Sequence, residues 1–284
     1  MKPITIMSNT EFIQKNYSKL GLKQCSELLN ISKGKISYIV EKFNLKLTKK
    51  EKSKILMETR AKKSSDYNVP LSKFTTELNE ISTYVLGLLW ADGYIAKNTP
   101  NTKQRYDINI ECIDDDMTFF RIMLDKTGVW NFHSRQRNDW RQITKATTCN
   151  KELLTYLIKN EYHEKSLKSP TKIISKIPTH LIRYFILGVI DGDGCFYFNQ
   201  KHFLRQFTIA GSLNQDWSSF EAIFNELGII YKINRRPNNK TGSSDIRILN
   251  KTNIKKLGEY IYPTFEKDKI GLPRKYKKYL EIIE

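Results

Sequence analysis

Apolar and polar residues follow helical and strand periods along this chain, in an order of elements that occurs twice. Each copy begins with an apolar helix that ends at an Asp-Gly pair, and a hairpin, a helix, a second hairpin and a last helix are expected to follow. In the first copy the apolar helix ends at Asp92, the first hairpin is 94–98 with 105–113, the middle helix 115–126, the second hairpin 129–137 with 140–149, and the last helix 151–160. In the second copy the apolar helix ends at Asp193, the first hairpin is 195–200 with 203–213, the middle helix 216–227, the second hairpin 229–236 with 244–250, and the last helix 251–260. The predicted fold class is therefore α+β, with two pseudo-symmetric αββαββα units.

The two copies also agree residue by residue, at a separation of about one hundred positions. Val85-Leu-Gly-Leu-Leu-Trp-Ala-Asp-Gly93 corresponds to Ile186-Leu-Gly-Val-Ile-Asp-Gly-Asp-Gly194, and farther along Asp116 corresponds to Asp216. Solenoid repeats are much shorter, roughly 20–50 residues, so two similar subdomains are expected instead. We place the first unit at 80–178 and the second at 179–284.

The N-terminal part of the chain has a different pattern. Residues 10–46 contain three short helical patterns, the first with Thr10 as a candidate cap, the second from Leu22 to Asn30 and the third from Lys33 to Phe43. Ser32 is positioned to cap the third helix. The segment resembles a small all-α helix-turn-helix module over 1–47, with a plain helical hairpin as the alternative, and the Lys- and Ser-rich residues 48–79 are interpreted as a basic linker.

The charge balance restricts the partners. The chain has 48 Lys and Arg against 30 Asp and Glu, a net charge of +18 and a pI of about 9.6, which favours a polyanion. Nucleic acid is the first candidate, an anionic membrane surface the second, and a merely soluble basic protein remains the alternative. The apolar runs are too short to span a membrane, the N-terminus does not read as a secretory signal, and the four cysteines form no CxxC, so an intracellular protein is expected.

The paired motifs suggest both a contact and a reaction. Gly87 and Ala91 share one helix face, as do Gly188 and Gly192, and small residues at this spacing let two helix backbones approach closely. Each motif then places a carboxylate at a helix C-terminus, where the helix dipole disfavours it. Two such carboxylates brought together repel unless a proton or a cation intervenes, and oxygen ligands suit Mg²⁺. A polar helix end is the alternative for either motif taken singly.

The two nonamers resemble the signature of LAGLIDADG homing endonucleases, and the resemblance extends over about residues 80–284. It implies a saddle of two four-stranded sheets on double-stranded DNA and Mg²⁺-dependent hydrolysis of both strands by a monomer. It also implies metal binding at Asp92-Gly93 and Asp193-Gly194, and a basic residue after the last helix of each unit, assigned to Lys165 and Lys267. The first motif departs from the family pattern at Trp90, a position that does not ligate the metal.

An antiparallel β-ribbon can present side chains to base edges in the major groove. Strand alternation places Ile230, Lys232, Asn234 and Arg236 on one face. The candidate DNA-contacting residues are Ser32, Lys33, Lys35, Ser37 and Lys42 of the N-terminal module, Arg135, Arg137 and Arg141 of the first unit, and Arg205, Gln206, Lys232, Asn234, Arg236 and Arg247 of the second.

Three functions are compatible with these patterns. The first is a sequence-specific DNA endonuclease that makes a staggered double-strand cut. The second is a binding protein on the same fold, either an RNA maturase that assists intron splicing or a regulator that does not cut. The third is a purely structural duplicated domain. Both aspartates favour the endonuclease, and the net charge of +18 argues against the structural role.

Overall fold

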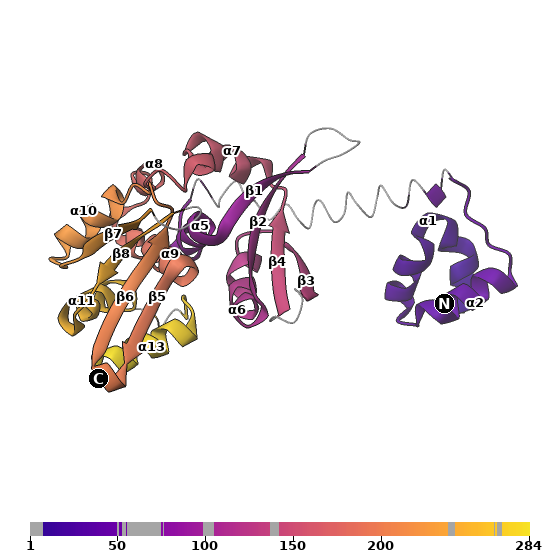
Figure 1. Cartoon of the computed structure of the whole chain (residues 1–284). Coiled ribbons are helices and arrows are strands. Elements are labelled where there is room, and N and C mark those ends of the chain that lie inside the picture. The colour runs from indigo at the N-terminus through magenta and orange to yellow at the C-terminus, as the bar shows by residue number, and fades with distance from the viewer. Residues whose placement is uncertain are drawn as a thin grey trace, which may run out of the picture. The chain divides into compact units, whose positions relative to one another are not determined.

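The computed structural model divides into two compact units, Met1–Val69 and Pro70–Glu284 (Figure 1). The residues that it describes are 8–49, 51–52, 55, 75, 77–98, 105–136, 142–237, 242–263, 265 and 269–284. The segment 48–79 that the sequence suggests as a linker therefore lies largely outside the described residues. Within the described part of the chain, no helix is long and apolar enough to cross a membrane.

The N-terminal unit contains the three expected helical segments. Helix α1 (Asn9–Leu29) is interrupted at Gly21, whose φ of 67° lies in the region that favours glycine, and α2 (Lys33–Lys42) follows a short turn. Ser8, and not Thr10, caps α1, because its side chain and that of Glu11 satisfy each other's backbone N–H groups in a capping box. Ser32 caps α2 as expected, and its side chain accepts from the backbone of Lys35. A small core of four residues buries the facing sides: Ile13, Cys25, Ile36 and Ile39.

The C-terminal unit confirms the predicted fold class of two αββαββα units. The first comprises α5 (Glu80–Asp92), β1 (Gly93–Asn98), β2 (Arg105–Ile113), α6 (Asp114–Asp125), β3 (Asn131–Gln136), β4 (Gln142–Thr148) and α7 (Lys151–Lys159). The second comprises α9 (Ile182–Asp193), β5 (Gly194–Asn199), β6 (Leu204–Gly211), α10 (Ser218–Glu226), β7 (Lys232–Arg236), β8 (Ser243–Ile248) and α11 (Lys251–Ile261). A 3₁₀ turn (Tyr162–Glu164) and α8 (Thr171–Ile174) connect the units.

Each unit contributes one antiparallel four-stranded sheet, with strand orders β1-β2-β4-β3 and β5-β6-β8-β7. One face of each sheet is apolar and packs against helices, as shown by the burial of Ile108 and Ile110 on β2 and of Phe207 and Ile209 on β6. Side chains alternate between faces along a strand, so the neighbours of these residues point to the opposite side. We call that opposite side of each sheet its open face.

Within the C-terminal unit, the two αββαββα units meet through their motif helices α5 and α9, which lie side by side between the two sheets (Figure 1). A Cβ atom added at Gly87 would stand 2.0 Å from the Phe185 carbonyl oxygen, and one at Gly188 would stand 2.1 Å from that of Tyr84. The helix backbones are thus in direct contact at both glycines. This confirms the close approach predicted from the small residues of the motifs.

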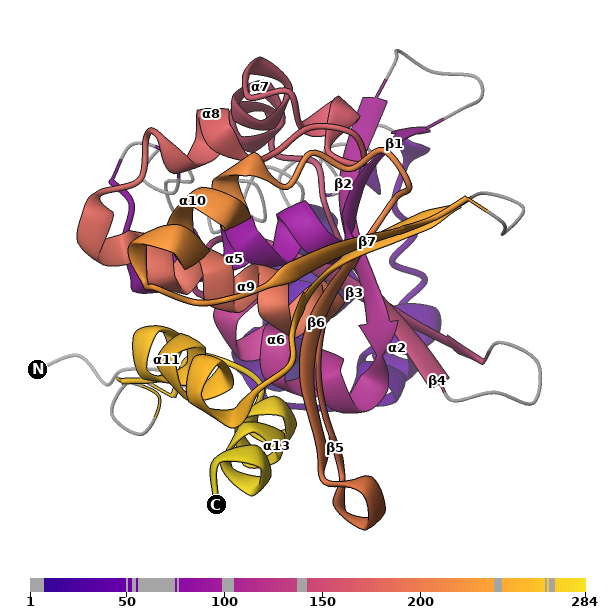
Figure 2. The same cartoon turned by 60° about the vertical axis from the view of Figure 1, so that its left-hand side comes forward.

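A helix that the repeat does not predict closes the chain. Helix α13 (Pro273–Ile283) begins with a proline at its first position, which suits a helix start, and buries Lys275, Tyr279 and Ile282 along one face. It packs beside α11 and β5 (Figure 2), and Gly258 of α11 leaves the room that the Tyr279 ring fills. Among the described residues, the first αββαββα unit has no helix that corresponds to α13. After α7 the chain passes through the 3₁₀ turn and α8 into the second αββαββα unit.

Candidate active site

The two motif aspartates stand where a helix changes into a strand. Helix α5 ends at Asp92 and β1 begins at Gly93, while α9 ends at Asp193 and β5 begins at Gly194. Glycine is needed at both junctions because a Cβ would stand 2.6 Å from the Leu89 carbonyl oxygen in the first and 2.5 Å from that of Ile190 in the second. Each carboxylate is thereby fixed at the C-terminus of its helix.

The helix contact brings the two C-termini together. A Cβ at Gly192 would lie 2.3 Å from the Ala91 Cβ and 3.1 Å from Oδ2 of Asp92, so the Asp92 carboxylate lies directly against the end of α9. Burial, and then the charge of Asp193, raise the pKa of Asp92 to about 6. Burial also raises the pKa of Asp193, although its side chain reaches solvent and water screens part of this effect. The sequence prediction that two carboxylates meet at this junction agrees with this geometry.

Lys165 lies at the end of the first motif helix. Its Nζ donates to the carbonyl oxygen of Trp90 at 2.8 Å and also to that of Ala91. A cation at these unpaired carbonyls interacts favourably with the helix dipole. Burial lowers the pKa of Lys165 to about 8, an effect that the charges of Asp193 and Asp92 oppose. An ammonium group thus stands within the electrostatic reach of both carboxylates.

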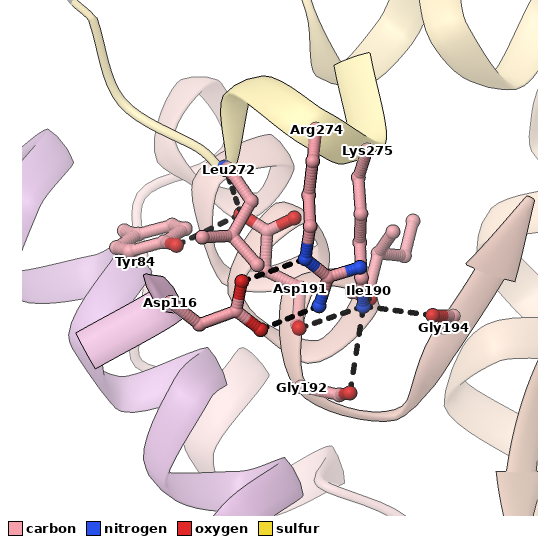
Figure 3. Close-up of polar contacts among 9 residues, drawn as sticks. All are labelled: Tyr84, Asp116, Ile190, Asp191, Gly192, Gly194, Leu272, Arg274 and Lys275. Carbon is pink, nitrogen blue, oxygen red and sulfur yellow. Dashed lines mark hydrogen bonds and ion pairs between the residues drawn. The ribbon is translucent and has the colours of Figure 1, made fainter. Parts of the chain in front are cut away.

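Lys275 takes the corresponding position in the second unit. Its Nζ donates at 2.7 Å to each of three carbonyl oxygens, those of Ile190, Asp191 and Gly194 (Figure 3). Burial lowers the pKa of Lys275, and the nearby charge of Asp191 opposes this shift. Lys267, which the sequence suggests for this role, lies outside the described residues. The residue that the structure places at the end of α9 is therefore Lys275.

Sequence reasoning missed Lys275 because the connection after the last repeat helix is longer in the second unit than in the first. The alignment of the two copies ends near Tyr262, and α13 begins only at Pro273. The sequence does contain one indication that Lys275 has a specific role. A lysine in the first turn of a helix works against the helix dipole, so Lys275 just after Pro273 calls for a specific partner.

The donor set at the two aspartates fits Mg²⁺. Within the described residues, neither carboxylate forms a hydrogen bond or an ion pair closer than 4 Å, so both retain oxygens for a cation. The described residues contain no group of three or more His, Cys, Asp and Glu side chains that could enclose a metal. Mg²⁺ does not require one, because it usually retains several waters and binds one or two carboxylates together with substrate phosphates.

The metal site predicted from the sequence also includes Gly93 and Gly194. In the structure the Gly194 carbonyl oxygen accepts from Lys275. A cavity of about 310 Å³ opens beside Asp193 and Lys165, with walls that include Trp90 and Trp217. The carboxylate of the second motif is therefore accessible from this side.

The second sheet carries a polar cluster on its open face. Strand register places Lys232, Asn234 and Arg236 of β7 opposite Arg247, Asp245 and Ser243 of β8. Asp245 accepts from Asn234 Nδ2 at 2.9 Å and pairs with both Arg236 and Arg247. The alternation predicted for β7 is confirmed for Lys232, Asn234 and Arg236, whereas Ile230 precedes the strand. This face presents more cations than anions.

The other candidate contacts are distributed unevenly. Gln206 lies on the open face with Thr208, whereas Arg205 lies on the helix side of β6, where its Nε donates to the Ile282 carbonyl oxygen at 3.0 Å. Arg135 is on the open face of the first sheet and pairs with Glu111 at 2.6 Å. Arg137 and Arg141 lie outside the described residues. Among the candidate DNA-contacting residues of the N-terminal module, Ser37 is half-buried and the others are exposed: Ser32, Lys33, Lys35 and Lys42.

The chain was compared with protein families, curated proteins and solved structures. No protein-family model and no curated protein matches this sequence. The chain is similar to a solved structure of the LAGLIDADG meganuclease I-AabMI bound to uncleaved DNA, with 13% sequence identity, 72% of this chain and 89% of that chain covered, and a TM-score of 0.49. It is similar to the homing endonuclease I-WcaI bound to its DNA recognition sequence, with 16% identity, 75% and 93% covered, and a TM-score of 0.47.

Proposed function

We propose that this chain is a sequence-specific DNA endonuclease of the LAGLIDADG type, which uses Mg²⁺ to cut both strands of a duplex and leaves a staggered break. The single observation that carries the proposal is the pair of carboxylates at the adjoining C-termini of α5 and α9. Neither has a hydrogen-bond or ion-pair partner among the described residues, and each unit sets a lysine beside them. A structural role would leave the mutual repulsion of Asp92 and Asp193 without a benefit.

The residues of this chain divide the work in the following way. Asp92 and Asp193 would hold the cation, which would supply charge neutralisation and a more acidic bound water. Lys165 Nζ and Lys275 Nζ place positive charge beside the scissile phosphates, where negative charge develops during phosphoryl transfer. The open faces of the two sheets bind the duplex on either side of the aspartates, and a single chain supplies both halves, so the protein acts as a monomer.

The test is direct cleavage of DNA. The full-length protein is incubated with a randomised duplex library in Mg²⁺, and the new ends are captured and sequenced. The proposal expects recurrent ends on both strands around one sequence, with none when EDTA replaces Mg²⁺. Specific binding of the library without any ends would indicate a regulator, and binding to structured RNA instead of duplex DNA would indicate a maturase.

Binding to the duplex should depend strongly on salt. Each phosphate contact adds roughly 0.9 to the slope of log affinity against log salt concentration. We expect Lys232→Ala, on the open face of β7, to lower that slope by about 0.9 in filter binding or anisotropy titrations. Lys255→Ala, an exposed substitution on α11 in the helix layer, should leave the slope unchanged. Equal slopes for both variants would argue against the open face as the contact surface.

The N-terminal module should extend the bound site without taking part in the reaction. Replacing Lys33 and Lys35 by alanine removes two exposed charges next to the Ser32 cap of α2. We expect weaker binding and a footprint that is shorter on one flank, with unchanged cut positions, because a tethered module contributes through its effective concentration. Lys15→Ala combined with Lys19→Ala on α1 is the control. A footprint that is the same in both double variants would show that α2 does not touch DNA.

A further inference from the structure

The segments that carry the two active-site lysines are anchored in different ways. Lys165 follows α7 within its own unit, next to Tyr162, whose ring centroid lies 5.5 Å from the Lys165 Nζ. Tyr162 is buried, its hydroxyl donates to the Leu89 carbonyl oxygen at 2.6 Å, and its ring packs edge-on against Trp90. Trp90 is the sixth residue of the first motif, where the second motif has Asp191. The first lysine is thus held by two carbonyl oxygens of its motif helix and by the adjacent Tyr162 ring, all within one unit.

On the second side, the Asp191 carboxylate holds the start of the helix that carries Lys275. One oxygen of its buried carboxylate accepts from the Tyr84 hydroxyl and from the backbone N–H of Leu272, both at 2.8 Å (Figure 3). Leu272 is the residue that precedes α13, so the carboxylate lies at the N-terminus of that helix, where a negative charge is favourable. Tyr84 belongs to the first unit. The start of α13 is therefore bound to α9 and, through the same carboxylate, to α5.

An ion pair adds a second link between α13 and the first unit. Arg274 donates through Nε to Oδ1 of Asp116 at 2.6 Å and through Nη2 to Oδ2, so the contact is bidentate (Figure 3). Asp116 lies in the first turn of α6 and is 7% exposed. A bidentate arginine–carboxylate pair fixes orientation as well as distance. Arg274 is the immediate neighbour of Lys275, so this contact orients the turn that carries the lysine.

The pseudo-symmetric positions contain a cross-unit contact but, among the described residues, no ion pair: the backbone N–H of Asp216 donates at 2.8 Å to the carbonyl oxygen of Leu167, in the connection that carries Lys165. The side chain of Asp216, which corresponds to that of Asp116, instead accepts at 2.9 Å from the Ser218 backbone N–H, the first of its own helix. Glu164, which precedes Lys165 as Arg274 precedes Lys275, pairs with Lys168 in its own connection. The cross-unit ion pair thus serves one lysine only.

We propose that the Asp116–Arg274 pair is a positioning contact between the two units, which holds Lys275 at the end of α9, and that cleavage of only one DNA strand depends on it. The inference rests on the proposed endonuclease function. In a phosphoryl-transfer site that works by positioned charge, a displacement of about 1 Å in a reacting group reduces the rate by up to about a hundredfold. Lys165, anchored by Tyr162, keeps its place when the pair is removed.

The experiment measures the two strands of one cognate duplex separately, each labelled with a different fluorophore, under single-turnover conditions with saturating full-length protein. Lys275→Met and Lys165→Met first establish which strand each lysine serves. We expect Arg274→Met and Asp116→Asn each to slow the strand that Lys275→Met slows, by about tenfold to a hundredfold, and to leave the other strand within about twofold. Nicked duplex should therefore accumulate.

Two further variants separate positioning from a general structural role. Arg274→Met combined with Lys275→Met should be no slower than Lys275→Met alone, because the pair acts through that lysine. Arg274→Lys, which keeps the charge without the bidentate geometry, should recover part of the rate. Lys278→Met, which breaks the ion pair of Lys278 with Glu281 within α13, is the control and should leave both strands at the wild-type rate.

The outcomes distinguish this inference from the proposed function. If the wild-type protein cuts the duplex, and Arg274→Met leaves both rates unchanged or slows both strands equally, the positioning role is overturned and the proposed endonuclease function stands. If the rate losses of Arg274→Met and Lys275→Met multiply in the variant that combines them, the positioning role is overturned as well. A wild-type protein that cuts no duplex overturns both. Thermal unfolding of each variant, together with duplex binding in EDTA, identifies any loss of rate that comes from loss of the fold.

Discussion

Asparagine in place of Asp92 or of Asp193 is expected to reduce double-strand cleavage by at least about a thousandfold, because a cation contributes several kcal/mol to the transition state and each 1.36 kcal/mol is a factor of ten. An amide keeps the shape of the carboxylate but lacks its charge. Within the described residues neither carboxylate forms a hydrogen bond, so the fold loses no contact. Binding to duplex DNA in EDTA should remain at the wild-type level or become tighter.

The measurement is single-turnover cleavage of each strand of the cognate duplex, accompanied by an anisotropy titration without metal. Asp115→Asn makes the same chemical change at an exposed position in α6 and is expected to retain wild-type rates. Wild-type cleavage by either motif variant would refute the assignment of both carboxylates. Loss of binding in EDTA would mean instead that the aspartates support the fold.

Alanine at Gly188 is expected to destabilise the C-terminal unit by about 3 kcal/mol or more, although glycine-to-alanine changes in helices usually stabilise by roughly 0.5–1 kcal/mol. The added Cβ would stand 2.1 Å from the Tyr84 carbonyl oxygen and 2.7 Å from the Leu88 nitrogen. These are backbone atoms, so no side-chain rotation relieves the contact and the two motif helices must separate. For a unit of this size the melting temperature should fall by about 6 to 12 °C.

Differential scanning calorimetry measures this effect, and Gly34→Ala provides the matched substitution. Gly34 is also a helical glycine, and a Cβ added there meets nothing within 4 Å. We expect that variant to leave the unfolding of the C-terminal unit unchanged and to stabilise its own helix. If Gly188→Ala unfolds at the wild-type temperature, the backbones at the helix contact are farther apart than described here.

The sequence predicts most of the fold because the signals that specify it are local. The period of the apolar residues, the glycines that end helices and the turn residues between strands each act over a few positions, and the duplicate confirms each of them. The helix contact is also predictable, since small residues four positions apart allow close packing. Even the capping of α2 by Ser32 follows from one residue, whereas at α1 the competition between Ser8 and Thr10 is decided by the reciprocal bond of Glu11.

The rest of the site depends on contacts between distant segments, which local patterns do not record. Lys275 meets α9 only because α13 folds back onto it, and the repeat gives no alignment there. Arg205 illustrates a different limit. Adjacent residues of a strand point to opposite faces, so Arg205 and Gln206 cannot both lie on the open face, and the burial of Phe207 places Gln206 there.

The cross-unit pair also bears on how such a chain could be divided or recombined. A symmetric dimer of two first units would lack α13, and a dimer of two second units would offer its Arg274 only Asp216, which already accepts from the Ser218 backbone N–H. The contact at Gly87 and Gly188 requires a glycine on each helix, and a related half with the same motif would supply it. Exchanging one half for that of a related protein should therefore preserve assembly but slow one strand cut, and such a hybrid would accumulate nicked duplex until Asp116 and Arg274 are supplied together.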